Sequence, residues 1–261
     1  MTEPVIMEVR EGDAVAILML NRPEKRNALD PGTVRALKEA LDAVERDERV
    51  RVVLLEGAGR DFCAGADLAH IEAMVDASYE EHLADAAALG ELFVRMRRFA
   101  RPIVAAVQGN ALAGGAGLAT ACDIVLVSDD AWLGYPEVHI GFVPAIVMNM
   151  LIRSVGEKTA FELVATGKRI DAGEAHRIGL VNAVISRHTF AADARAFAVE
   201  LAAKSATSIG FSKRLLYELD RLSFEEGIAR GEEVNAEARM TEDCRAGVKA
   251  FLADRKAGEA T

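Results

Sequence analysis

Residues 110–137 read NALAGGAGLATACDIVLVSDDAWLGYPE and decide the fold of this chain. The glycines Gly114, Gly115 and Gly117 open an apolar stretch, and Glu137 follows twenty residues later. Small residues at the start of a helix let a substrate carbonyl approach bare backbone N–H groups. The stretch therefore predicts an oxyanion site that is served by one carboxylate base.

The same arrangement occurs a second time. FCAGAD at residues 62–67 follows a β-type run, as ALAGGAG at residues 111–117 does. If Ala66 and Gly114 each open a helix, their N–H groups have no partner within the helix and lie at its positive end. Two such donors that converge would form an oxyanion hole. A thioester fits this site because removal of a proton beside its carbonyl leaves an enolate oxygen that carries the charge.

Glu137 is the candidate base. Pro136 and Gly141 predict a turn here, from which the Glu137 side chain can project into a cleft. Apolar neighbours should raise its pKa toward the range that a general base needs.

Composition and charge restrict the function further. The chain has 261 residues, 51% of them hydrophobic and 28% charged, which predicts one large domain with a helical tail. A net charge of −10 without a long basic block argues against a nucleic-acid partner. No signal-type core and no apolar run of about 18 residues argue against export or a membrane span. Cys63, Cys122 and Cys244 form no C-x-x-C pair and suit a reducing compartment, so we expect a cytoplasmic protein.

Strand and helix signals alternate along the chain, which predicts an α/β fold with a mostly buried sheet. Asp30 and Pro31 read as the N-cap and first-turn proline of a helix over residues 33–46. The other expected elements are a hairpin of residues 6–9 and 14–20 that turns at Glu11, Gly12 and Asp13; strands at 51–55, 103–107 and 123–127; helices at 68–74 and 79–99; and almost continuous helix from 190 onward.

Several enzyme classes are excluded by spacing. GAGRDF at residues 57–62 has Phe62 where a dinucleotide fingerprint needs its third glycine, and the sequence has no P-loop. It also lacks a G-x-S-x-G elbow and an H-E-x-x-H pair, and its five histidines are scattered. These observations argue against nicotinamide, ATP, serine-hydrolase and zinc chemistry.

The chain resembles the crotonase superfamily, also called the enoyl-CoA hydratase/isomerase family. The matching segments are LNRPEKRNALD (residues 20–30), FCAGADL (62–68), PIVAAVQGNALAGGAGLATACDI (102–124), LGYPEVHIGFVP (133–144) and ATGKRIDAGEAHRIGLVNAV (165–184). The resemblance implies a crotonase-type spiral of ββα repeats, here residues 1–195, followed by a C-terminal α-helical trimerisation region, residues 196–261. It also implies an acyl-CoA thioester substrate, no metal or other cofactor, and a homotrimer or a dimer of trimers.

Site residues are carried over by position from the same resemblance. The oxyanion donors are the backbone N–H groups of Ala66 and Gly114. The residues expected to line the coenzyme A groove are Lys25, Arg26, Ala28, Ala64, Asp67 and Leu68, with Phe251 from the C-terminal helix, in some members of a neighbouring subunit. A basic pair can serve phosphates on an acidic protein because it acts locally. A solvated turn is the alternative for Lys25 and Arg26, and Asp67 also fits the N-cap of a helix that begins at Leu68.

One departure from the family pattern affects the choice of reaction. Typical hydratases carry two glutamates that hold and activate water; here Gly117 stands at the first position and Glu137 at the second. Gly117 either serves close packing or leaves space for a bulky acyl chain, so we include it among the substrate-contacting residues. The remaining segments, GGAGLA and EVHIGFVPAIV, resemble a bacterial hydratase-like branch related to hydratases of branched glutaconyl-type thioesters.

We therefore expect an enoyl-CoA hydratase that adds water across the 2,3 double bond through an enolate held in the oxyanion hole. The alternative on the same fold is a Δ3-Δ2-enoyl-CoA isomerase with Glu137 as its sole proton shuttle. The alternative from another class is a catalytically silent coenzyme A-binding homologue.

Overall fold

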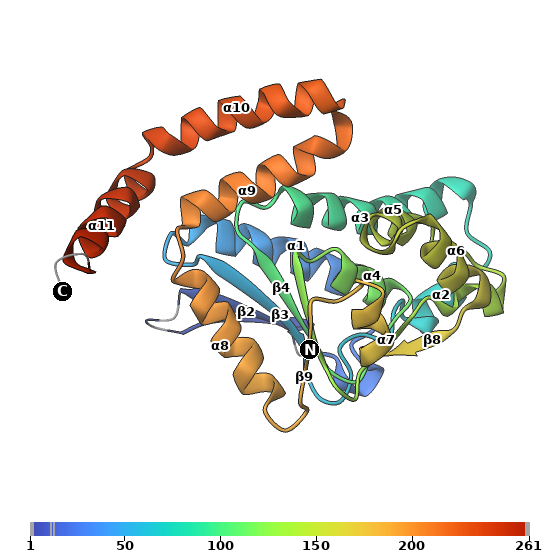
Figure 1. Cartoon of the computed structure of the whole chain (residues 1–261). Helices are drawn as coiled ribbons and strands as arrows, with labels where there is room; N and C mark the ends of the chain where they lie inside the picture. Colours follow the sequence, from blue (N-terminus) through green and yellow to red (C-terminus); the bar gives the residue numbers. More distant parts are fainter. Residues whose placement is uncertain (1–2, 11, 13, 259–261) are drawn as a thin grey trace.

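The computed structural model describes residues 3–10, 12 and 14–258, and a six-stranded sheet forms its centre (Figure 1). Its strands are β1 (Val5–Val9), β2 (Val15–Leu20), β3 (Val52–Gly57), β4 (Ile103–Val107), β6 (Ile124–Ser128) and β9 (Ala183–Ile185). They lie in the order β1-β2-β3-β4-β6-β9. Only β1 runs antiparallel to its neighbour, so the carboxyl ends of the other five strands meet at one edge.

Helices cover the first face of this sheet. The helices that contribute to this core include α1 (Pro31–Arg46), α3 (Tyr79–Arg98), α4 (Gly114–Thr120) and α5 (Ala145–Val155). α1 begins where the sequence predicts, because Asp30 Oδ1 accepts a hydrogen bond from the Thr33 N–H (2.7 Å). The shorter elements are η1 (Pro23–Lys25), α2 (Leu68–Ala73), η2 (Pro136–Ile140), α6 (Glu157–Thr166) and α7 (Ala172–Arg177).

Side-chain alternation along the strands fills a core on each face. In β3, Val53 and Leu55 pack into the first core, whereas Val52 and Leu54 pack into the second, on the opposite face. The second face is covered by α8 (Phe190–Ala202) through its buried alanines. Since α8 belongs to this core, the division expected between residues 195 and 196 falls inside a helix that packs on the sheet.

A second, three-stranded sheet lies beside the first. Its strands are β5 (Asn110–Leu112), β7 (Trp132–Gly134) and β8 (Arg169–Asp171), in the order β5-β7-β8. β5 leads directly into α4 and β7 leads into η2. This small sheet therefore holds together the two segments that carry Gly114 and Glu137.

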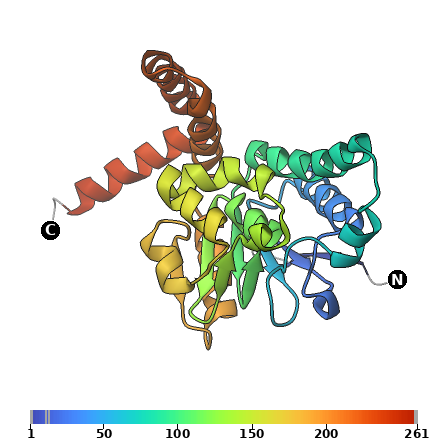
Figure 2. The same ribbon diagram turned by 90° about the vertical axis from the view of Figure 1, so that its right-hand side faces the viewer.

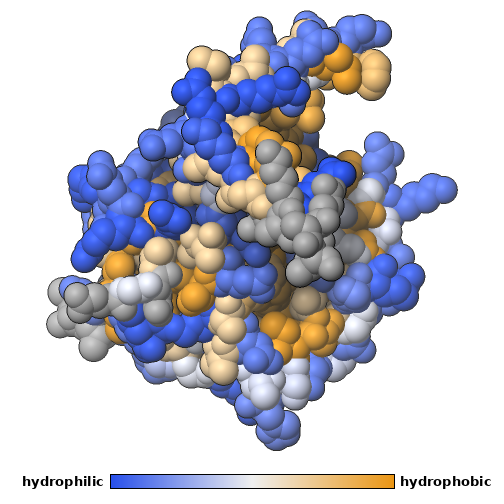
Figure 3. Space-filling view, turned by 60° about the vertical axis from the view of Figure 1, so that its left-hand side comes forward, coloured by the Kyte–Doolittle hydropathy of each residue, from blue (hydrophilic) through white to orange (hydrophobic). Residues whose placement is uncertain are grey.

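The C-terminal helices form an arm. After α8 come α9 (Ala206–Glu218), η3 (Leu219–Arg221), α10 (Phe224–Met240) and α11 (Glu242–Gly258), and α10 and α11 project from the body (Figures 1 and 2). Exposed apolar side chains on the arm include Phe224, Ile228, Met240, Val248 and Phe251. On the side from which the arm projects, hydrophobic surface lies open between hydrophilic side chains (Figure 3).

Most expected elements are present within one to three residues. The β1–β2 hairpin forms, but Glu11 and Asp13 of its expected turn lie outside the described residues. Helix from residue 190 onward is confirmed, as is the α/β class.

Candidate active site

Two backbone segments lie against each other beside the sheet. Leu29 forms an isolated parallel bridge with Ala66, and its N–H donates to the Gly65 carbonyl at 2.7 Å. Gly65 has a φ of +99°, and a Cβ there would lie 2.8 Å from the Ala113 Cβ and 3.4 Å from the Gly114 nitrogen. The Cβ position of Gly114 is 3.9 Å from the Ala66 nitrogen. Glycine at position 65 therefore allows the segments of Ala66 and Gly114 to approach each other.

The N–H groups of Ala66 and Gly114 are both free of hydrogen bonds to other residues that the structure describes. Gly114 is the first residue of α4, so its N–H lies at the positive end of the helix. Ala113 before it has φ 51° and ψ −125°, a backbone strain of about 1–3 kcal/mol that the bond from its N–H to the Gly134 carbonyl (2.8 Å) helps to hold. Two free donors on adjoining segments suit a carbonyl oxygen that gains negative charge.

Glu137 lies in η2, three residues after Gly134. The Gly134 carbonyl accepts the bond from the Ala113 N–H, so Glu137 follows closely on the segment that contacts Ala113. The residue is 8% exposed, and its Oε2 has no hydrogen-bond partner among the described residues. Burial raises the pKa of Glu137, and a bond from its own backbone N–H opposes the rise. The predicted direction of this pKa shift is thus confirmed. A buried carboxylate with one unused oxygen is suited to accept a proton from a bound substrate or water.

The predicted coenzyme A residues near the N-terminus lie on two adjoining segments. Lys25 ends η1, Arg26 follows it, and both are exposed. The Arg26 carbonyl accepts from the Ala64 N–H (3.0 Å), which joins the two segments that the sequence assigned to the groove. Ala28 is buried and Leu68 is 77% exposed. The two segments therefore present two exposed cations and an exposed apolar side chain close along the chain to Ala66.

Asp67 has a structural role. Its Oδ1 accepts from the Ala69 N–H (3.0 Å) and caps α2, and its Oδ2 binds Arg22 Nη2 (2.7 Å). Arg22 holds the pKa of Asp67 below its usual range. The N-cap role expected from the sequence is confirmed, with Oδ1 in the cap and Oδ2 in the ion pair with Arg22.

The sequence did not single out Arg22 and Asn27, whose side chains bind the backbone around the predicted coenzyme A residues. Arg22 also donates to the Ala28 carbonyl (2.8 Å) and pairs with Asp30 (3.0 Å). Asn27 is 1% exposed, and its amide donates to the carbonyls of Ala58 (2.9 Å) and Asp61 (2.8 Å). The polar letters in NRPEKRNAL were the available signal, but only the fold shows that these two side chains point inward.

Gly117 packs against a neighbouring helix. It is buried in α4, and a Cβ added there would overlap the Cγ2 methyl of Val147 in α5 and lie 3.2 Å from its Cγ1. The free face of this glycine is thus filled by a neighbouring helix and offers no space to a bulky acyl chain. Of the two roles expected for Gly117, the structure shows close packing, and a contact with the substrate stays a prediction.

Phe251 is not brought to this site by its own chain. It is 67% exposed on α11, at the far end of the molecule from α2 in both ribbon views (Figures 1 and 2). A contact with coenzyme A therefore requires a second copy of the chain, and it stays a prediction.

Over residues 3–10, 12 and 14–258, no three His, Cys, Asp or Glu side chains gather in a way that could hold a metal ion. Within the same residues, none of the helices is long and apolar enough to cross a membrane.

Comparison with known proteins identifies the family. The family model described as enoyl-CoA hydratase/isomerase matches residues 10–258. The chain belongs to the enoyl-CoA hydratase/isomerase family. This confirms the crotonase resemblance, and with it the prediction that the chain is an enzyme of the hydratase kind whose family acts on acyl-CoA thioesters.

Individual relatives agree with this assignment. A Thermus thermophilus protein, named as a candidate enoyl-CoA hydratase, is 43% identical to this chain over 250 residues. The match covers 96% of this chain and 98% of that protein. The 2,3-dehydroadipyl-CoA hydratase of Escherichia coli is 34% identical and covers 92% of this chain and 93% of its own length. The crystal structure of an enoyl-CoA hydratase from Mycobacterium smegmatis superposes with a TM-score of 0.91 at 31% identity over 96% of each chain. The crotonase-type fold is therefore confirmed.

Proposed function

We propose that this member of the enoyl-CoA hydratase/isomerase family adds water across the 2,3 double bond of an enoyl-CoA thioester. The N–H groups of Ala66 and Gly114 hold the thioester oxygen, and Glu137 is the base. The observation that carries the proposal is the buried Oε2 of Glu137, which has no partner among the described residues and lies close along the chain to the Ala113–Gly134 contact.

The proton can be followed through the reaction. Glu137 removes one proton from water while the oxygen of that water forms a bond to carbon 3 of the substrate. The electron pair of the double bond moves onto the thioester oxygen, where the two N–H donors stabilise the charge. Glu137, now protonated, returns the proton to carbon 2, and the enolate collapses to the 3-hydroxyacyl thioester. A raised pKa suits a group that must both take and give this proton.

One observation favours a second candidate. The family resemblance implies that typical hydratases carry a second glutamate at the position where this chain has Gly117. Val147 fills the space beside that glycine. A single carboxylate is sufficient for Δ3-Δ2 isomerisation, in which Glu137 takes a proton from carbon 2 and returns it to carbon 4. No water needs to be activated in that reaction.

The absorbance of the conjugated enoyl thioester separates the two candidates. The enzyme is mixed with a trans-2-enoyl-CoA and, separately, with a trans-3-enoyl-CoA. Falling absorbance with the first substrate and formation of a 3-hydroxyacyl-CoA would support hydration. Rising absorbance with the second substrate alone would contradict hydration and support isomerisation.

We propose that the nucleotide end of coenzyme A lies over Lys25 and Arg26. Both side chains are exposed, and no described carboxylate lies within 4.0 Å of either. The reaction as written needs no metal or redox cofactor. The cysteines Cys63, Cys122 and Cys244 are all free, which supports a reducing compartment such as the cytoplasm.

We propose further that the arm mediates a homotrimer or a dimer of trimers. Phe224 is 80% exposed and Phe251 is 67% exposed, and large apolar side chains left open on a projecting arm favour burial against another copy. Light scattering of the full chain tests this, and a monomer at micromolar concentration would contradict it. Replacing Phe251 with Ala should weaken assembly more than replacing the polar, exposed Lys249 on the same helix.

A further inference from the structure

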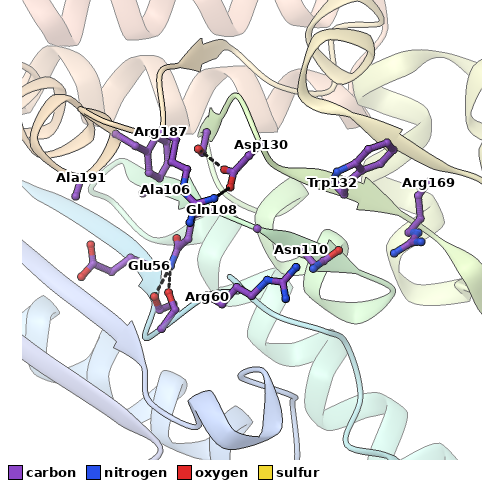
Figure 4. A pocket seen from close by; sticks show the side chains of 15 residues that line it. Glu56, Arg60, Ala106, Gln108, Asn110, Asp130, Trp132, Arg169, Arg187 and Ala191 are labelled. Atoms are coloured by element: carbon purple, nitrogen blue, oxygen red, sulfur yellow. Dashed lines mark hydrogen bonds and ion pairs between the residues drawn. The ribbon is translucent and has the colours of Figure 1, made fainter.

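A cavity of about 750 Å³ lies at the carboxyl ends of β3, β4 and β6 (Figure 4). Gly57 ends β3, Gln108 follows β4, and Ser128 ends β6, and all three line the cavity. In parallel sheets, ligands bind in the crevice outside the carboxyl ends of the strands, and small-molecule sites commonly have volumes of about 300–1,000 Å³. Ala66, Gly114 and Glu137 do not line it, so it is separate from the proposed catalytic site.

Three arginines from different segments surround this cavity, which we call the arginine cavity. Arg60 follows β3, Arg169 opens β8, and Arg187 follows β9. Arg187 Nη1 pairs with Asp130 Oδ2 at 2.7 Å. Within the described part of the chain, no carboxylate lies within 4.0 Å of the guanidinium of Arg60 or Arg169. The lining holds three arginines and two acids, Glu56 and Asp130, so its formal charge is positive on a chain with a net charge of −10.

Two acids line the arginine cavity, and neither pairs with Arg60 or Arg169. Asp130 binds Arg187 and also accepts from Ser128 Oγ (2.6 Å). Burial raises the pKa of Glu56 and the charge of Glu8 acts in the same direction, while the charges of Arg195 and Arg10 oppose the rise. The positive charge of Arg60 and Arg169 therefore remains available to a ligand.

The N-terminus of α8 adds to the positive potential. Phe190 and Ala191 line the arginine cavity, and they are the first two residues of this 13-residue helix. Thr189 at the N-cap makes no side-chain hydrogen bond to the first turn, because its hydroxyl donates to the Ser186 carbonyl. The positive end of the α8 dipole thus points to the same space as the arginines.

Trp132 provides a flat apolar surface at the rim. It is 45% exposed and lies at the same end of the arginine cavity as Arg169 (Figure 4). The backbone of Arg169 is fixed, since β8 pairs Arg169 with Gly134 of β7. An indole ring beside a guanidinium fits a ligand that joins a flat or apolar part to an anionic group.

We propose that the arginine cavity binds a small oxyanion-bearing molecule, whose phosphate or carboxylate group is held by Arg60 and Arg169, while the N-terminus of α8 adds to the positive potential of the cavity. The charge of the site selects an anion, and the volume admits a molecule of metabolite size. The two possible sources of the oxyanion, a phosphorylated and a carboxylated ligand, share this recognition chemistry.

Trp132 is the only tryptophan of the chain, so its fluorescence reports directly on the arginine cavity. The full-length protein is titrated with pyrophosphate and, separately, with citrate, while sodium chloride keeps the ionic strength constant. We expect a saturable change in emission with at least one probe, and the tighter one identifies the class of ligand. Arg60→Gln and Arg169→Gln should each raise the Kd about tenfold or more.

Arg35→Gln is the matched control, because Arg35 is exposed on α1, away from the cavity lining. It should leave the Kd unchanged. An equal loss of affinity in Arg35→Gln and Arg169→Gln would show a general charge effect and overturn the proposal. So would loss of binding in Lys25→Gln with none in Arg60→Gln, which would place the anion in the coenzyme A groove. The absence of both a fluorescence change and calorimetric heat with either probe, up to about 10 mM, would also overturn it.

Discussion

Gly117 of α4 and Val147 of α5 pack so closely that a single methyl group on the glycine would overlap the valine side chain. Both residues are buried, and Val147 is 4% exposed. The pair holds the helix that begins with the Gly114 N–H against the helix that follows the Glu137 turn. Its energetics can be measured without any substrate.

Gly117→Ala should destabilise the protein by about 1–3 kcal/mol, because the added methyl overpacks a filled site. In a Val147→Ala background the overlap is relieved, and the same change should stabilise by up to about 1 kcal/mol through helix propensity. Urea unfolding of the four proteins of the cycle measures the coupling. Gly231→Ala in α10, where nothing lies within 4 Å of the added methyl, is the control and should not destabilise. Additive effects of the two core changes would contradict the described contact.

Glu137→Gln should lower kcat by about 10²–10⁴-fold and leave thioester binding nearly unchanged, because the amide keeps the shape but cannot accept the proton. Glu72→Gln is the matched control, since Glu72 is an exposed glutamate on α2 near the site entrance. It should retain turnover. Steady-state kinetics with a calorimetric Kd for a product thioester separate the two parameters. Full activity in Glu137→Gln would rule out Glu137 as the base.

The raised pKa of Glu137 predicts a pH-dependent cost to stability. The folded chain holds the Glu137 proton to a higher pH than the unfolded chain does, so stability falls as pH rises from the ordinary glutamate pKa through the raised one. Glu137→Gln removes this penalty and should be more stable than the wild type at neutral pH. The difference should shrink as pH falls below the unfolded pKa. Urea unfolding at a series of pH values measures it, and a difference that does not change with pH would argue against an ionised, desolvated Glu137.

Lys213 fastens α9 to the sheet and should be important for stability. Its Nζ donates to Asp123 Oδ2 (2.7 Å) and to the carbonyls of Met96 and Arg101 (both 3.0 Å), and its side chain is 6% exposed. Lys213→Met should cost about 3–5 kcal/mol, because it leaves the Asp123 carboxylate buried without its counter-ion. Tyr217→Phe, which removes only the hydroxyl that donates to Asp123 Oδ1, should cost about 1–3 kcal/mol. Chemical denaturation compares them, and equal losses would contradict the leading role given to the charge.

Elements with strong local signals could be predicted from the sequence. Asp30 and Pro31 define the start of α1 because the cap and the first-turn proline act within one turn of backbone. The apolar run of β4 predicts a strand buried on both faces, and it occupies residues 103–107 as expected. Gly114 opens α4, as the glycine-rich stretch predicts. Ala66 lies before Asp67, the N-cap of α2, so the expectation that Ala66 opens a helix is wrong. The donor role of the two N–H groups stays a prediction.

Features that depend on distant partners could not be predicted. β5 and β8 are three-residue strands that both pair with β7, which lies between them in the small sheet. Gly117 could not be assigned to packing until Val147, thirty residues later, was placed beside it. The arginine cavity joins Arg60 and Arg187 across nearly half of the chain, and no local pattern connects them.

The shortness of β5 has a further consequence. Asn110 at its start lines the arginine cavity, and its last residue precedes Ala113 and the Gly114 donor, so about 10 Å of strand separates the two places. This strand is held on two sides, by pairing with β7 and by the bridge from Ala111 to Cys63. An anion in the arginine cavity and a thioester at the Gly114 donor would therefore contact the two ends of one short strand. A shift of the backbone at one end would move the other end as well. Any coupling between them must be reciprocal: whatever factor an anion applies to thioester affinity, the thioester applies to the anion.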